Sequence, residues 1–118
     1  VVICVHEHQH VVQHDREGIS FEVSYLTDSA ARARWEAEAY RSNLELHFWR
    51  SGQMPSPRAL AELLRNYGCS AADVDVATRA LMLSAYSIRK GAVINEASHV
   101  AIDWLDTHLP RLRAKQPN

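Results

Sequence analysis

The chain opens with the stretch VVICVHEHQHVVQH, residues 1–14, and this stretch decides the fold. Inside it, His6-Glu7-x-x-His10 is an H-E-x-x-H motif. On a helix, His6 and His10 are one turn apart and only about 40° apart around the axis, so both imidazoles can bind one zinc ion. Glu7 flanks the same position, where it can take a proton from a metal-activated water and later give it to a leaving amine.

An apolar run, VVICV over residues 1–5, precedes the motif and shows no polar stripe of the kind that a surface helix has. We therefore expect this helix to be buried on all sides, with Cys4 as a small core residue. Other helices of the chain can cover one or two of these sides. The remaining cover is expected from a lost N-terminal segment, a second copy of the chain or another subunit, because soluble monomers rarely expose a large apolar patch.

The competing interpretation of the motif is an exposed histidine cluster, since four of the chain's seven histidines fall in the opening stretch. His8 lies about 200° from His6 around a helix and should point away from the metal. His14 lies about 12 Å from His6 along the axis and is expected at the surface. The longer metzincin pattern fails, because Gln13 and Arg16 occupy the positions where it needs glycine and histidine.

Composition indicates one globular domain. The 118 residues are 47% hydrophobic and 23% charged, which is enough for a single core. The net charge of −1 favours neither nucleic acid nor an acidic membrane as a partner. Two cysteines make no disulfide framework, and no signal peptide or membrane-length apolar run is visible, so a cytoplasmic location is favoured.

Capping residues and glycine stops predict a mainly α fold of about five helices. The expected helices cover about residues 1–15, 28–50, 57–67, 70–90 and 95–109. Four aromatic residues are expected in their core: Trp35, Phe48, Trp49 and Trp104. Residues 1–110 should form a single helical domain, and residues 111–118 a basic, frayed C-terminal tail.

One segment, residues 19–26, is ambiguous. Phe21, Val23 and Tyr25 alternate with polar residues, which is typical of a strand. A short helix is almost as well supported, because the chain offers no second strand to pair with it.

The helix expected over residues 28–50 carries two candidates for a further ligand, Glu36 and Glu38. Zinc held by two histidines needs at least one more protein ligand, and a glutamate from a neighbouring helix is a standard solution. The two glutamates are about 200° apart on a helix, so they cannot both face the metal. The alternative for Glu36 is a solvated carboxylate paired with a nearby arginine.

At this point the sequence resembles a known family. His6-Glu7-x-x-His10 followed by Glu36-x-x-Ala39 is similar to the motifs of small gluzincin metallopeptidases. The resemblance covers the first 50 residues, under half of the chain, and implies a zincin-like helical core. It implies His6, His10 and Glu36 as zinc ligands and Glu7 as general base. Zincins usually bind extended substrate on the edge of a sheet that precedes the active helix, and this chain shows no such sheet.

The resemblance has one departure. The family often has aspartate after the alanine, where it supports a ligand histidine, and this chain has Tyr40. The Tyr40 hydroxyl could donate to a substrate oxyanion or to a ligand. Asn43 and His47 share its helix face, which we interpret as a satisfied polar surface, with a cleft lining as the alternative. Four other residues are candidates for oxyanion stabilisation: Tyr25, Tyr86, His99 and His108.

The sequence thus predicts a zinc-dependent metallopeptidase that acts on a peptide or protein substrate, with Glu38 as the rival third ligand. The alternative is a non-catalytic zincin-like domain in a larger assembly, where metal only fastens helices together. The element that covers residues 1–5 would also supply the missing substrate edge, so the isolated chain is expected to be a poor enzyme.

Overall fold

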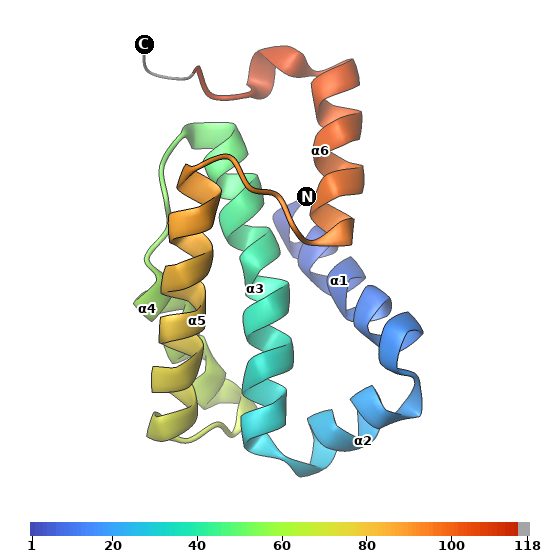
Figure 1. The fold of residues 1–118 in the computed structure, drawn as a ribbon, viewed down its shortest axis with the longest axis vertical. Coiled ribbons are helices and arrows are strands. Elements are labelled where there is room, and N and C mark those ends of the chain that lie inside the picture. The colour runs from blue at the N-terminus through green and yellow to red at the C-terminus, as the bar shows by residue number, and fades with distance from the viewer. Residues whose placement is uncertain (116–118) are drawn as a thin grey trace.

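The computed structural model describes residues 1–115 and contains six α-helices and two short 3-10 helices in that range (Figure 1). The α-helices are α1 (Val2–Glu17), α2 (Ile19–Thr27), α3 (Ser29–Ser51), α4 (Pro57–Glu62), α5 (Ala71–Arg89) and α6 (Glu96–His108). The 3-10 helices are η1 (Leu63–Tyr67) and η2 (Pro110–Leu112). Residues 1–115 contain no strand, so the prediction of a mainly α fold is confirmed.

The sixth helix is α2, which forms where the sequence was ambiguous. The strand alternative is wrong, because helical spacing brings Phe21 and Tyr25 to one side, where their rings are 5.8 Å apart. Val23 then points to solvent and is 54% exposed. The single helix expected over residues 57–67 is divided into α4 and η1.

Helix α3 is the centre of the fold, and the other helices pack around it (Figure 1). Helix α5 lies along one side of α3 and carries α4 with it, while α1 and α6 lie on the other side. Helix α2 connects the end of α1 to the start of α3. Both ends of α3 follow from sequence: Asp28 accepts a hydrogen bond from the backbone N–H of Ala30, and Gly52 takes a left-handed conformation with φ 72°.

The apolar core falls into two clusters on opposite sides of α3. The larger joins α3 to α4 and α5 and includes Leu44, Leu64, Val74 and Leu81, all fully buried. The smaller joins α1, the end of α3 and α6 through residues such as Val5, Leu46, Trp49 and Ile102. The expectation that Trp104 is a core residue is wrong, because it lies on the outer face of α6 and is 54% exposed.

Helix α1 buries a polar face and exposes an apolar one. Val1 and Ile3 are 77% and 75% exposed, so the chain's own helices cover only part of the apolar run. Cys4 is exposed, so within residues 1–115 the expectation that it is a core residue is wrong. The reason is rotational: polar side chains one and two turns further along face α3, and this orientation turns Val1, Ile3 and Cys4 outward while Val5 stays buried. That an element outside the chain covers this run stays a prediction.

The start of the expected tail lies against the helical body. The backbone N–H of Ala114 donates to the Trp49 carbonyl at 2.8 Å, and Arg113 pairs with Asp106 at 2.9 Å. Residues 116–118 of the tail lie outside the described residues. Within residues 1–115, no helix combines the length and apolar character that a bilayer crossing requires.

Leu44→Ala should lower the free energy of unfolding by about 2–5 kcal/mol, because it leaves a cavity at the centre of the larger cluster. Leu83→Ala is the matched control, since Leu83 is 73% exposed on α5, and it should change stability by less than about 0.5 kcal/mol. Urea unfolding followed by circular dichroism measures both. Equal losses would contradict the placement of α3 at the centre.

Candidate metal centre

Three side chains from two helices converge on one point. His6 and His10 extend from α1, and Glu36 extends from the middle of α3. One ligand atom from each lies within 4.8 Å of the others, a spacing at which the group could hold a metal ion. His6 Nε2 is 3.1 Å from Glu36 Oε2, and His10 Nε2 is 3.2 Å from Glu36 Oε1. The predicted convergence of these residues is therefore present.

The chemistry of this group fits a cation. The Nδ1 atoms of His6 and His10 lie 2.9 Å from Asn43 Oδ1 and 2.8 Å from Gln13 Oε1, so each imidazole faces an acceptor on both sides. A neutral imidazole has one N–H and can satisfy one acceptor. With Nδ1 as the donor, both Nε2 lone pairs face the Glu36 carboxylate, and a cation among them turns this repulsion into coordination.

One alternative without a cation is two protonated imidazoles around one carboxylate. Glu36 is 2% exposed and His6 is 7% exposed, so this arrangement would bury more positive than negative charge. A divalent ion bound by neutral imidazoles uses the same atoms without that conflict.

Contacts within the group shift the pKa values of Glu36 and His10. In the absence of a metal ion, burial opposes ionisation of Glu36, but its contacts with His10, His6 and Tyr25 outweigh burial and lower its pKa to about 2. Burial lowers the pKa of His10, but its hydrogen bonds with Glu36 and Gln13 and the charges of Glu36 and Glu7 raise it overall. Glu7 is thus close enough for its charge to act on His10, while its own side chain is exposed.

Aromatic side chains form the wall of the site. Tyr25 donates its hydroxyl to Glu36 Oε1 at 2.6 Å, and burial together with this hydrogen bond raises the pKa of Tyr25. Phe21 stacks on His10 with ring centroids 6.1 Å apart, and Tyr40 packs against His6 at 4.8 Å. Among the four candidates for oxyanion stabilisation, Tyr25 is placed directly on the group, whereas the other three are exposed on α5 and α6.

The rival ligand Glu38 faces a different set of partners. It accepts hydrogen bonds from Gln9, Gln13 and Arg16 at 3.3, 2.6 and 3.0 Å. The expected separation of the two glutamates around α3 is therefore observed. His8 is exposed, and His14 is exposed and pairs with Glu22 at 3.0 Å, as their helical positions predicted.

Sequence reasoning missed the amides that support the two imidazoles. The sequence marks Gln13 only as a residue that breaks a longer metal motif, and it indicates a polar surface for Asn43. The available signal was spacing: His6, Gln9, His10 and Gln13 follow the i, i+3, i+4, i+7 pattern of one helix face. A polar group at each of these positions indicates a buried polar face once one of them is assigned to a metal site.

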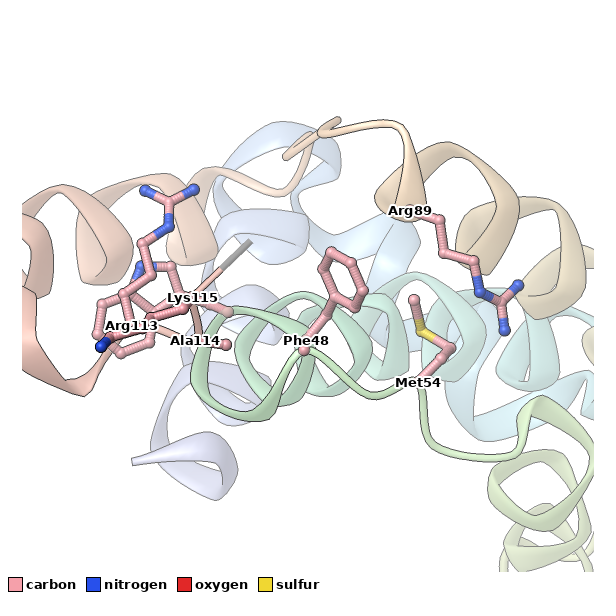
Figure 2. Close-up of a pocket in the computed structure, with 8 residues that line it drawn as sticks. Phe48, Met54, Arg89, Arg113, Ala114 and Lys115 are labelled. Atoms are coloured by element: carbon pink, nitrogen blue, oxygen red, sulfur yellow. The ribbon is translucent and has the colours of Figure 1, made fainter. Parts of the chain in front are cut away.

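One hollow adjoins the site, and another lies apart from it. An apolar one of about 260 Å³ adjoins it and is lined by His10, Phe21, Glu22, Tyr25 and Leu26. A larger one of about 390 Å³ lies at the C-terminal end of α3, with Phe48 between Arg89 and residues 113–115 (Figure 2). Phe48 is twelve residues beyond Glu36, or about 18 Å along the helix, so the larger hollow is separate from the His/Glu group.

Comparisons with protein-family models, with characterised proteins and with solved structures found no match to this chain. The resemblance to the gluzincins therefore stays a prediction from the two sequence motifs.

His10→Ala should abolish stoichiometric binding of a divalent metal, because two donors remain where three converge. His8→Ala is the matched control, since His8 lies on the same helix and is exposed, and it should keep about one ion per chain. Elemental analysis after loading and desalting measures both. Equal metal content in the two variants would contradict the assignment of His10.

Proposed function

We propose that this chain is a zinc-dependent metallopeptidase in which His6, His10 and Glu36 hold the zinc ion. The observation that carries the proposal is the convergence of two Nε2 atoms and one carboxylate beside an H-E-x-x-H glutamate. Two histidines and one glutamate, with a fourth position left open, are a ligand set of catalytic zinc sites. Imidazole nitrogen favours zinc over magnesium or calcium, which prefer oxygen ligands.

Bound zinc supplies Lewis acidity, which makes a water molecule nucleophilic near neutral pH and polarises a carbonyl. Glu7 accepts a proton from the attacking water as the new carbon–oxygen bond forms. It then donates that proton to the amide nitrogen as the carbon–nitrogen bond breaks, so the proton count balances. An exposed carboxylate one residue from His6 suits this role, because it must reach both water and substrate.

Two tyrosines lie beside the same centre: the Tyr25 hydroxyl contacts Glu36, and the Tyr40 ring packs against His6. The Tyr25 hydroxyl already donates to Glu36, and a modest rotation would direct it to an oxyanion on a substrate carbonyl. The pKa of Tyr40 is raised by burial and by nearby negative charge, so its hydroxyl keeps its proton near neutral pH. The adjoining apolar hollow gives a substrate side chain a place beside His10.

A second function is a non-catalytic metal clamp that fastens α1 to α3. The burial of His6 and Glu36, with Tyr25 of α2 on the carboxylate, favours it. Val1 and Ile3 are exposed, and the partner proposed for them is a preceding segment, a second copy or another subunit. In the peptidase, that partner would supply the edge along which substrate binds. In the clamp, the same partner would be a neighbour in an assembly.

Glu7→Gln should keep zinc and the fold but slow hydrolysis by at least about 100-fold, because an amide cannot accept the proton. Glu17→Gln is the matched control, since it removes an exposed carboxylate from the same helix. Rates are measured on any peptide that the parent cleaves in a mixed peptide library. Undiminished cleavage by Glu7→Gln would rule out Glu7 as the base.

Acetohydroxamate separates the peptidase from the clamp, because it binds zinc through a position that the protein leaves open. Calorimetry should show binding to the zinc-loaded chain and none to the metal-free chain. Failure to bind the zinc-loaded chain would favour the clamp.

A further inference from the structure

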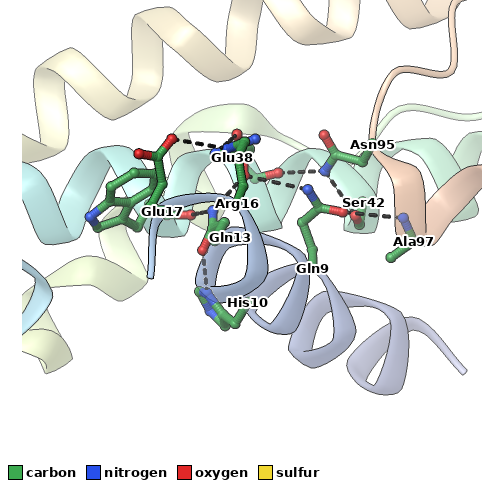
Figure 3. Close-up of polar contacts among 10 residues, drawn as sticks. Gln9, His10, Gln13, Arg16, Glu17, Glu38, Ser42, Asn95 and Ala97 are labelled. Carbon is green, nitrogen blue, oxygen red and sulfur yellow. Dashed lines mark hydrogen bonds and ion pairs between the residues drawn. The ribbon is translucent and has the colours of Figure 1, made fainter. Parts of the chain in front are cut away.

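Gln13 is held by hydrogen bonds on all three of its polar positions, and its exposed fraction is 0%. Its amide nitrogen donates to the Trp35 carbonyl at 2.8 Å and to Glu38 Oε2 at 2.6 Å, while Oε1 lies 2.8 Å from His10 Nδ1 (Figure 3). Arg16 in turn holds the other oxygen of Glu38 at 3.0 Å.

These contacts determine which way the amide points. A backbone carbonyl and a carboxylate only accept hydrogen bonds, so both amide hydrogens of Gln13 must point toward Trp35 and Glu38. The Gln13 oxygen is then the atom that faces His10, and an oxygen there requires the hydrogen of the imidazole on Nδ1. The Nε2 lone pair of His10 is left facing the Glu36 side of the ring.

We propose that Gln13, anchored by Glu38, is a positioning residue that fixes His10 in the Nδ1–H tautomer and so presents Nε2 to the metal. The inference rests on the metal site of the proposed function and adds the residues that prepare it. It also gives Glu38 a role: Glu38 acts on His10 through Gln13 and does not touch the metal.

Gln9 provides a matched control, because it lies on the same buried face of α1. It lies one turn before Gln13, is 2% exposed and donates to the same Glu38 oxygen at 3.3 Å. Its own oxygen accepts from the backbone N–H of Ala97 at 3.2 Å, so it joins α1 to α6 without touching an imidazole. Loss of Gln9 therefore removes comparable buried hydrogen bonds but leaves the His10 contact in place.

The test compares Gln13→Met with Gln9→Met by two measurements. Nitrogen-15 NMR of the metal-free protein at mildly alkaline pH reports which ring nitrogen of His10 carries the hydrogen. Competition with a chelator gives the Kd for zinc. Gln13→Met should lose the single tautomer and bind zinc about 10- to 100-fold more weakly. Gln9→Met should keep the tautomer and bind zinc within about twofold of the parent.

A double exchange, Gln13→Glu with Glu38→Gln, keeps the proposal testable if Gln13→Met fails to fold. Gln13→Glu alone places two carboxylates in contact and should lose zinc and stability. In the double variant the new amide at position 38 can donate to the new carboxylate at position 13, which still accepts from His10 Nδ1, while the Trp35 carbonyl and Gln9 each lose a partner. It should therefore recover the tautomer and part of the affinity for zinc that Gln13→Glu loses.

Two results would overturn the proposal: equal weakening of zinc binding by Gln13→Met and Gln9→Met, or an unchanged tautomer in Gln13→Met. A parent chain that binds no zinc would contradict the proposed function instead, and the tautomer measurement on metal-free protein would still decide the role of Gln13.

Discussion

The charge of the buried Glu36 carboxylate is the constraint on which the N-terminal half of the structure depends. An ion removed from water costs several kcal/mol unless hydrogen bonds and opposite charge compensate it. The partners of Glu36 come from two other helices, His6 and His10 from α1 and Tyr25 from α2. Helix α2 has no buried residue of its own, so such polar contacts position it together with the edge-to-face contact of Phe21 with Trp35 at 5.2 Å. Arg32 adds to them with hydrogen bonds to the carbonyls of Tyr25 and Leu26.

The contacts that compensate the Glu36 charge give helix α1 an inverted surface, with polar side chains buried and apolar ones exposed. A helix of a globular protein normally buries its apolar stripe, yet α1 buries His6, Gln9 and Gln13 and exposes Val1 and Ile3. The arrangement is tolerated because the buried polar groups have partners on α3 and α6. Proteins break such local rules mainly where function requires it. The inversion is therefore an independent physical sign that this face of α1 serves a site rather than a core.

The sequence allowed α3 to be predicted well, because Asp28 and Gly52 mark its ends and helical geometry separates Glu36 from Glu38. The failures have physical causes as well. Hydrophobicity alone predicts that Val1 and Ile3 are buried, but it does not show which face of α1 the histidines occupy. Gln13 was missed because a glutamine on a helix is usually solvated, and its three hydrogen bonds depend on α3 being beside it.

Helix α3 controls both sides of the His10 ring. Glu36 faces Nε2 directly, while Glu38, two residues further, reaches Nδ1 through Gln13. A helix keeps two such side chains at a fixed rotation of about 200°, so the distance between the two supports hardly varies. A site whose supports come from one rigid element keeps its geometry better than one built on loops. The cover from α2 is a separate element, which joins α1 at Gly18 with φ 63° and reaches the site through Tyr25. The two supports of the His10 ring therefore depend on α3, while the cover over Glu36 depends on a second helix.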